Sequence, residues 1–284
     1  MSDLDPRLTP ARPDLAAAQL KGRVEADRFV EPVDWQCNVS AAPIRKAPDA
    51  RAAMDDQLLA GECFAVLEAR DGWAWGFSRA GGYVGWVDMA GLSDTPVEPD
   101  RHVCVLRTYA FSEPSIKSAP DHLLSQNALL VCGRREGRFV EAVGLGWIVE
   151  AHTAALDERA GDFVAVAESF LAAPYLWGGK ESLGLDCSGL TQMALRACGI
   201  DVPRDADQQE TALTSVWHNV TLERARARGD IVFWPGHVGI MTDSEYLLHA
   251  NAASMDVALE PFAEAEARIR EAENPVRTIL RQPR

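Results

Sequence analysis

The pattern of hydrophobic residues changes near residue 151, and this change constrains the fold more than any other feature of the sequence. Before it, short strand-like runs such as residues 62–68 and 73–77 are separated by glycine-containing turns. After it, residues 162–171 and 187–198 carry apolar side chains at helical spacing. We therefore expect an all-β region followed by an α+β domain with its own core.

The first half predicts hairpins that follow one another closely. The turns at Asp71-Gly72 and Gly81-Gly82 separate runs rich in aromatic and β-branched residues, and this spacing favours a small closed barrel. A weaker copy of the same order covers residues 129–149, which indicates an internal repeat. Residues 1–30 are rich in Pro, Arg and Asp and contain a short helical pattern at residues 15–21. We interpret them as an arm that packs on another part of the protein.

The second half predicts helices first and a sheet afterwards. Four runs beyond Gly229 have the composition of strands. They are residues 231–234, 237–242, 246–250 and 276–280. We expect these runs to form a small antiparallel sheet that follows the helices of the domain.

Charge and composition exclude several classes of function. The 284-residue chain has a formal net charge of −14, so nucleic acid and anionic membranes should repel it. No apolar run approaches the roughly 20 residues of a membrane helix, and residues 1–30 lack a signal-peptide core, so we expect a cytoplasmic protein. The six cysteines lack zinc-ligand spacing, and we expect mostly free thiols and neither a metal nor a cofactor.

Cys187 differs from the other cysteines in its local sequence. Asp186-Cys187-Ser188-Gly189 follows a glycine-rich loop and opens the second predicted helix. Free backbone N–H groups and the positive end of the helix dipole stabilise a thiolate in a first turn. We therefore expect the pKa of Cys187 to be lowered and its sulfur to act as a nucleophile.

Two histidines on neighbouring predicted strands can supply the base. His237 follows the turn at Pro235-Gly236, and His249 lies on the next strand along the chain. Antiparallel pairing brings them side by side, so one imidazole can deprotonate Cys187 while the other holds it in the productive tautomer. We assign His237 as the base and His249 as the orienting residue. The alternative is a core thiol with unrelated surface histidines.

Three motifs occur in order and at compact spacing. They are Asp186-Cys-Ser-Gly, the run Gly-Asp-Ile-Val-Phe-Trp-Pro-Gly-His-Val-Gly-Ile at residues 229–240, and His249-Ala-Asn251. Together they resemble the NlpC/P60 family of cell-wall peptidases. The resemblance implies a papain-like fold and a thiolate that attacks the γ-carbonyl of D-glutamate in the stem peptide. The leaving group in that family is the diamino acid, commonly meso-diaminopimelate.

Residues around these motifs also look like the family's pattern near the substrate pocket. We assign to substrate binding Tyr175, Trp177, Asp186, Ser188, Arg204 and Asp205. The backbone N–H of Cys187 and the hydroxyl of Tyr175 are our candidates for holding the oxyanion. The structural alternatives are that Tyr175 and Trp177 pack the loop and that Asp186 caps the helix.

The first predicted barrel resembles bacterial SH3 domains through Gly61-Glu62, Asp71-Gly72-Trp73 and Gly85-Trp86-Val87. In family members with such domains, the first barrel closes one end of the cleft. The resemblance implies short substrates with a free amino-terminal L-Ala, whose ammonium group pairs with an acidic residue of the barrel. Asp55 and Tyr83 occupy the matching positions. The alternative is that Asp55 is an exposed loop acid.

These observations give a division into four parts. We expect an arm at residues 1–32, a bacterial SH3-like barrel at 33–94, a second, degenerate SH3-like barrel at 95–152 and an NlpC/P60 catalytic domain at 153–284. The expected activity is hydrolysis of the bond from γ-D-Glu to the diamino acid in muropeptides, during recycling, by a monomer without nucleic-acid or membrane partners. A papain-like amidase or acyltransferase, or a non-catalytic protein that binds wall fragments, is the alternative.

Overall fold

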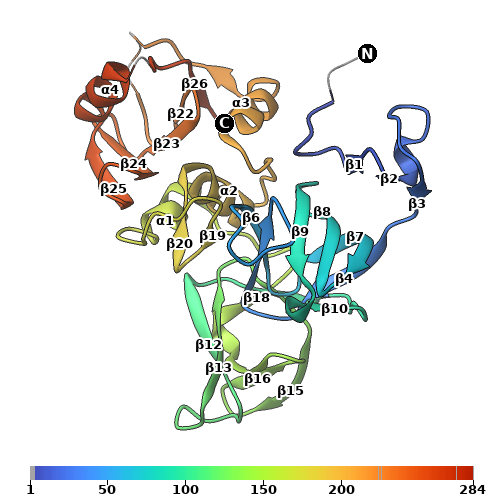
Figure 1. Ribbon diagram of the computed structural model, residues 1–284. Helices are drawn as coiled ribbons and strands as arrows, with labels where there is room; N and C mark the ends of the chain where they lie inside the picture. The colour runs from blue at the N-terminus through green and yellow to red at the C-terminus, as the bar shows by residue number, and fades with distance from the viewer. Residues whose placement is uncertain (1–3, 223, 225, 273, 284) are drawn as a thin grey trace. The chain divides into compact units, whose positions relative to one another are not determined.

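Two patterns of secondary structure divide the chain, and Figure 1 shows both of them. The computed structural model describes residues 4–222, 224, 226–272 and 274–283. It consists of two units, Met1–Leu156 and Asp157–Arg284. The described part of the first unit forms strands and 3-10 helices, whereas the second unit combines α-helices with a sheet. No described helix is both long enough and apolar enough to cross a membrane.

A seven-stranded sheet forms the first barrel. Its order is β10 (Leu92–Ser93), β4 (Val33–Cys37), β7 (Cys63–Arg70), β8 (Trp73–Ser78), β9 (Val84–Asp88), β5 (Ala41–Arg45) and β6 (Met54–Leu59). Phe64, Ile44 and Leu58 are buried at its centre. The strands predicted around residues 62–68 and 73–77 are therefore confirmed.

The second sheet repeats the path of the first. Its order is β13 (Pro120–Ser125), β12 (Arg107–Phe111), β17 (Gly146–Val149), β16 (Phe139–Ala142) and β15 (Cys132–Glu136). The first sheet has the corresponding order β6-β5-β9-β8-β7. In both, a 3-10 helix, η2 (Met89–Gly91) or η3 (Glu150–His152), follows the third strand of the meander. The weak echo in the sequence thus corresponds to a repeated topology.

Short strands complete this repeat. After η3, β18 (Thr153–Ala155) pairs with β11 (Arg101–Val103), just as β10 pairs with β4 after η2. β11 also pairs with β14 (Leu129–Leu130). The four-part division with its exact limits stays a prediction.

The amino-terminal arm packs on the outer face of the first barrel. It contains β1 (Ala11–Arg12), β2 (Leu15–Ala17), η1 (Ala18–Leu20) and β3 (Phe29–Val30). Leu15 and Leu20 pack against Trp75 and Trp86, and the Arg12 guanidinium lies 4.1 Å from the Trp75 ring centroid. The predicted helix at residues 15–21 is therefore mostly wrong, because packing on the barrel favours an extended chain there.

The second unit has the expected α+β fold. Its helices are α1 (Phe163–Glu168), α2 (Cys187–Ala197), α3 (Ala206–Thr214) and α4 (Phe262–Glu271). Its six-stranded sheet has the order β21 (His218–Asn219), β26 (Thr278–Arg281), β22 (Ile231–Trp234), β23 (His237–Met241), β24 (Tyr246–Asn251) and β25 (Asp256–Pro261). A small hairpin, β19 (Lys180–Glu181) and β20 (Gly184–Leu185), precedes α2.

The two faces of this sheet have different neighbours, and this decides where the site residues lie. α2 packs against β23 and β24. On the other face, Phe262 and Ala265 of α4 share a core with Trp234, Met241 and Leu247. Side chains alternate along a strand, so His237 and His249 lie on the same side as Met241 and Leu247, whereas the backbone N–H of Val238, next to His237, lies by the Cys187 sulfur at the start of α2.

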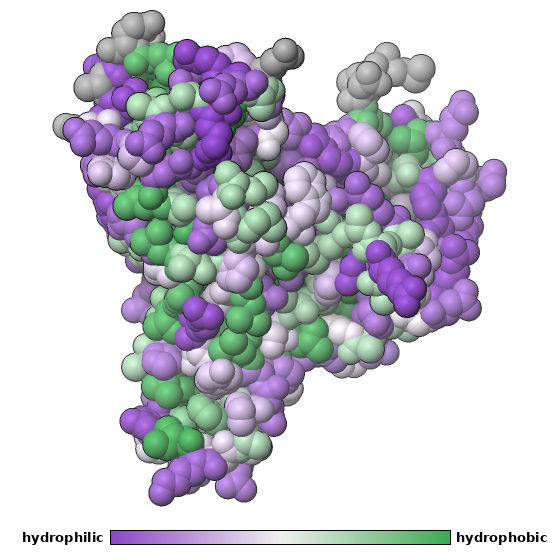
Figure 2. Space-filling view, turned by 60° about the vertical axis from the view of Figure 1, so that its left-hand side comes forward, coloured by the Kyte–Doolittle hydropathy of each residue, from purple (hydrophilic) through white to green (hydrophobic). Residues whose placement is uncertain are grey.

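Two expectations for this unit are wrong. α4 follows β25, so the helices do not all precede the sheet. It folds there because its apolar residues cover the face opposite α2, while Arg268 and Arg270 remain exposed. Figure 2 shows hydrophilic residues predominating at the upper left, in the region of α4. The first helix also ends at Glu168, earlier than predicted, because the chain turns so that the Ala172 N–H bonds to β25.

Candidate active site

Cys187 is the first residue of α2, as the sequence predicts. Asp186 caps this helix by accepting a hydrogen bond of 2.8 Å from the Gly189 N–H. A Cβ atom on Gly189 would lie 2.2 Å from the carbonyl oxygen of Gly179, so only glycine lets the helix start approach this loop. The Asp-Cys-Ser-Gly motif is therefore explained by packing on both sides of the cysteine.

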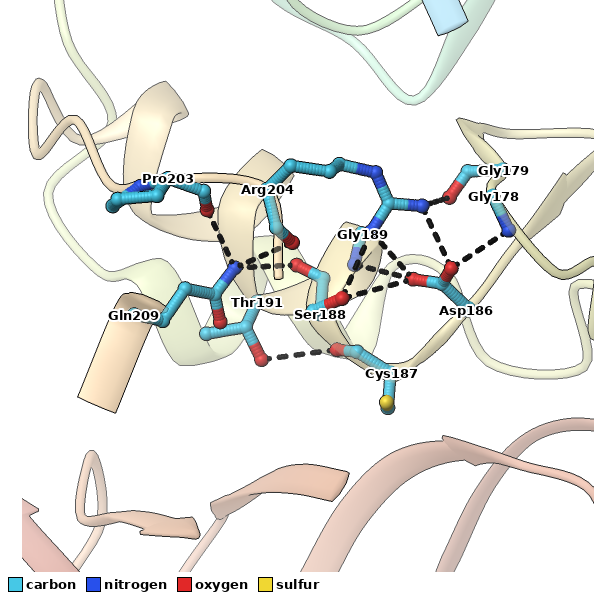
Figure 3. Close-up of polar contacts among 10 residues, drawn as sticks. All are labelled: Gly178, Gly179, Asp186, Cys187, Ser188, Gly189, Thr191, Pro203, Arg204 and Gln209. Carbon is cyan, nitrogen blue, oxygen red and sulfur yellow. Dashed lines mark hydrogen bonds and ion pairs between the residues drawn. The ribbon is translucent and has the colours of Figure 1, made fainter. Parts of the chain in front are cut away.

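A buried ion pair fixes this helix start, as Figure 3 shows. Arg204 donates to both carboxylate oxygens of Asp186, at 2.9 and 2.7 Å, and to the Ser188 hydroxyl at 2.8 Å. The Gly178 N–H donates to Asp186 at 2.8 Å. Arg204 is 1% exposed and Asp186 is 5% exposed. The bidentate hydrogen bonding between Arg204 and Asp186 holds the glycine-rich loop against α2.

The contacts of Asp186 match the structural alternative considered for it, a helix cap. Ser188 and Arg204 are bonded to it in the same network. Their direct contact with substrate stays a prediction, because all three side chains are buried and satisfied within the loop.

The Cys187 side chain points away from this network in Figure 3. Burial raises the pKa of the Cys187 thiol to about 12, the Asp186 carboxylate adds to this, and the backbone N–H groups of Val238 and Ser188 oppose it. The expected lowering of this pKa is therefore wrong. The Gly189 N–H is already taken by Asp186, and removal of the sulfur from water outweighs the helix position. The free protein thus holds a neutral thiol.

The two predicted histidines meet on the sheet. Nε2 of His237 and Nδ1 of His249 are 2.7 Å apart, with ring centroids 5.0 Å apart and planes at 66°. Gly239 lies between them on the same face, and a Cβ there would lie 3.2 Å from the His249 Cβ and 2.9 Å from Leu247 Cδ1. Because Gly239 has no side chain, the two histidine rings have room to contact each other.

Burial also keeps the His237 ring neutral. Its pKa is lowered to about 3, first by desolvation and then by the charges of His249 and Arg268. The backbone N–H of Val238, the residue after His237, is among the groups that act on the Cys187 sulfur. In the free protein, the neutral thiol of Cys187 therefore lies beside β23, which begins with the neutral imidazole of His237.

Glu260 joins this set, although sequence reasoning missed it. Nε2 of His249 lies 2.6 Å from Glu260 Oε1, and Arg268 of α4 bonds to the same oxygen. The sequence signal that could have found it is the register of β25, where Leu247 pairs with Glu260 and His249 with Ala258. Without a prediction of β25, no such register is available.

The remaining predicted pocket residues of this unit lie at varied depth. Tyr175 is half-buried, and burial, with Cys187 and Asp186, raises its pKa to about 12. Its hydroxyl therefore stays protonated and can donate a hydrogen bond. Trp177 is 63% exposed, and Asp205 precedes α3 without capping it through its side chain. No cluster of three metal-binding side chains occurs among the residues that the structure describes.

Asp55 and Tyr83 belong to the first unit. Ile44 pairs with Asp56 and Arg45 with Met54, so Asp55 is the extra residue of a β-bulge in β6. Its carboxylate lies 3.5 Å from the Lys46 ammonium. Tyr83 is 5% exposed. Their role in substrate binding stays a prediction.

Comparisons with known proteins agree with this architecture. A model described as the bacterial dipeptidyl-peptidase Sh3 domain matches residues 44–92, and the NlpC/P60 family model matches residues 172–270. Dipeptidyl-peptidase 6 of Lysinibacillus sphaericus is 37% identical over 101 residues, which is 36% of each chain. A gamma-D-glutamyl-L-lysine dipeptidyl-peptidase of Bacillus subtilis is 26% identical over 197 residues, 64% of this chain and 65% of that protein. The chain thus spans less than two thirds of either relative's length.

Two solved structures share the fold over most of the chain. The crystal structure of an NlpC/P60 family protein from Bacillus cereus has a TM-score of 0.72 at 20% identity and covers 87% of this chain and 99% of that one. An NlpC/P60 endopeptidase from Photobacterium damselae has a TM-score of 0.58 at 12% identity and covers 92% and 74%. The chain thus carries a bacterial SH3 domain at residues 44–92 and an NlpC/P60 domain at residues 172–270, in which Cys187 begins α2.

Proposed function

We propose that this protein hydrolyses the bond between γ-D-glutamate and the diamino acid of cell-wall stem peptides, with Cys187 as nucleophile. The observation that carries the proposal is the hydrogen bond of 2.7 Å between His237 and His249, on two strands that pack against α2, the helix that Cys187 begins. The name of the Bacillus subtilis relative, which specifies a γ-D-glutamyl-L-lysine bond, supports the substrate class.

The first step forms the carbon–sulfur bond. Because Nε2 of His237 faces His249, Nδ1 is the ring nitrogen left to accept the thiol proton. The sulfur then attacks the γ-carbonyl carbon, and the carbonyl oxygen becomes an oxyanion. The Cys187 N–H and the protonated Tyr175 hydroxyl are the proposed donors to this oxyanion.

The second step breaks the carbon–nitrogen bond. The protonated His237 gives its proton to the departing amine of the diamino acid, which leaves a thioester on Cys187. His237 then takes a proton from water, and the hydroxide adds to the thioester carbonyl. When the sulfur leaves, it recovers the proton from His237, and the γ-carboxylic acid of D-glutamate is released and loses its proton to solvent.

We further propose that the substrate is a short muropeptide with a free amino-terminal L-Ala. A bulge aims its extra side chain away from the regular strand pattern, and in β6 this side chain is the Asp55 carboxylate. An ionised carboxylate is the partner that an ammonium group requires when it leaves water. Recycling of wall fragments is the role that fits such a substrate.

The test is mass spectrometry of products from L-Ala-γ-D-Glu-L-Lys and L-Ala-γ-D-Glu-meso-diaminopimelate. Each peptide is supplied with a free and with an acetylated amino end, to wild-type protein and to Cys187→Ala. Cys198→Ala, a half-buried cysteine just after α2, is the matched control and should keep full turnover. Release of the diamino acid that persists in Cys187→Ala would remove the thiol mechanism.

The same panel tests Asp55. We expect Asp55→Ala to reduce kcat/KM for the free peptide about tenfold more than for the acetylated one, the loss of one charge-assisted hydrogen bond. Asp94→Ala, an exposed acid of the same unit, should leave the ratio unchanged. An equal ratio in both variants would exclude Asp55 from recognition of the amine.

A further inference from the structure

Glu260 ends a hydrogen-bonded series that starts at His237. His249 is 0% exposed, and both of its ring nitrogens are engaged, by His237 at 2.7 Å and by Glu260 at 2.6 Å. Bulk water cannot reach His249 to replace either partner. A buried imidazole that loses one of them would leave a polar nitrogen unsatisfied, so the Glu260 carboxylate is part of what holds this ring.

The carboxylate also decides where the protons lie. The pKa of Glu260 is lowered by the hydrogen bond from His249, against the effect of burial, so the group is an acceptor only. Nε2 of His249 must then carry hydrogen, and its Nδ1 must accept. His237 therefore donates through Nε2, and its Nδ1 holds the free electron pair. This is the tautomer that a base for a thiol requires.

We infer that Glu260 is a positioning residue for the catalytic pair: through His249 it fixes the tautomer of His237 and stabilises the imidazolium that forms when Cys187 loses its proton. The inference rests on the proposed function, in which His237 is the base. It extends the Cys-His-His set by a carboxylate from β25.

Arg268 acts on the same series with the opposite sign. It binds the Glu260 oxygen that His249 also binds, and its charge lowers the pKa of His237. Within the described structure, the charged groups that act on the histidine pair are Glu260 on β25 and Arg268 on α4. The Cys187 sulfur of α2 lies by the backbone N–H of Val238, next to His237. Neutralising Glu260 and neutralising Arg268 should therefore shift the titration of His237 in opposite directions.

The experiment measures the reactivity of the Cys187 thiol and needs no peptide substrate. The rate of alkylation by iodoacetamide is followed from pH 2.5 to pH 9, a range that includes the His237 pKa of about 3. Mass spectrometry of the Cys187 peptide reports it, because five other free cysteines can also react. The variants are Glu260→Gln and Arg268→Gln. Glu266→Gln is the matched control, since Glu266 also pairs with an arginine of α4, Arg270.

We expect Glu260→Gln to slow alkylation at pH 7 about tenfold, the loss of one charge-assisted hydrogen bond. The pH at which the alkylation rate falls on the acidic side should be lower in Glu260→Gln and higher in Arg268→Gln than in wild type. The alkylation rate of Glu266→Gln should stay within about twofold of wild type. Nitrogen-15 NMR of the free protein should show a single His249 tautomer in wild type and a mixture in Glu260→Gln. If Glu260 only supported the structure, the two variants would not shift the pH dependence of alkylation in opposite directions, and the His249 tautomer would not change.

Unchanged alkylation and unchanged His249 nitrogen shifts in Glu260→Gln would overturn the inference. If Glu260→Gln unfolds, Glu260→Asp is used instead, because it keeps the carboxylate on a shorter side chain. A folded Glu260→Asp should retain part of the wild-type alkylation rate of Cys187, and a folded variant that retains none would also overturn the inference. A wild-type protein that shows these alkylation effects but releases no diamino acid would refute the proposed function alone. Normal hydrolysis with no effect of Glu260→Gln would refute the inference alone.

Discussion

Two polar networks flank Cys187, and they differ in kind. The Asp186–Arg204 pair is buried, permanently charged and satisfied by backbone and hydroxyl groups. In the second network the His237 ring is neutral in the free protein, and its partner His249 leads to the carboxylate of Glu260 on β25. The first network can only hold geometry, whereas the second can take up and return a proton. Cys187 belongs to the helix start that the first network holds, and its sulfur lies by the Val238 N–H, next to His237 of the second.

The sharpest way to test this difference is to remove the base. His237→Ala should lower kcat/KM by about 1,000-fold, because proton transfer is lost. It should cost only about 1–3 kcal/mol of unfolding free energy, because Nδ1 of the buried His249 loses its partner. Hydrolysis of stem peptides and a denaturant melt measure the two quantities. His218→Ala, an exposed histidine of β21, is the control. A large drop in stability with modest loss of turnover would show that His237 is a structural residue.

Breaking the charged network should do the reverse. Arg204→Met leaves the Asp186 carboxylate buried without its partner and should cost about 3–5 kcal/mol of unfolding free energy. Arg135→Met breaks the exposed pair with Glu150 and should cost less than about 1 kcal/mol. Chemical denaturation measures both. Equal losses would mean that the Asp186–Arg204 pair is no more important than a surface pair.

An intermediate effect is expected at Gly239. Gly239→Ala places a Cβ against His249 and Leu247, so the rings should separate and turnover should fall roughly tenfold or more, at a cost of about 1–3 kcal/mol in stability. Gly161→Ala, where a Cβ meets open space, should change neither. Turnover and melting curves of Gly239→Ala and Gly161→Ala decide whether the contact between His237 and His249 requires glycine at position 239.

The smallest effect is the pH dependence of the resting pair. His237 has a folded pKa of about 3, below its ordinary value of 6.5, so the unfolded state binds a proton first and stability falls as the pH drops from 6.5 toward 3. Cys187 has a folded pKa of about 12 against an ordinary 9, so stability falls as the pH rises above 9. Thiolate absorbance of wild type minus Cys187→Ser should stay flat from pH 4 to pH 9. A step in that window would reveal a preformed thiolate–imidazolium pair.

Local sequence signals predicted α2 and the strands β22 to β24 well. Gly199 follows the end of α2, and the Pro235-Gly236 turn separates the apolar runs of β22 and β23. Local residues therefore indicate where these elements end. β25 carries Asp256, Glu260 and Pro261 and is only partly buried, so it has no such apolar pattern. Its absence from the prediction is why Glu260 was missed.

Tertiary effects account for the other differences. The pKa of Cys187 was predicted from its helix position alone, but burial by the rest of the unit reverses the shift. The Leu15–Ala17 segment becomes a strand because the tryptophans of the first barrel pack against it. Neither the degree of burial nor the packing partner can be taken from local periodicity.

The bulge at Asp55 has a consequence for how this protein could diverge. An extra residue in a strand can move by one position without a change in chain length, because the flanking pairs simply re-form one step along. Such a slide in β6 would present Asp56, which is now buried, in place of Asp55. A different side chain could thus be displayed by shifting hydrogen bonds alone, with the neighbouring strands β5 and β9 left as they are.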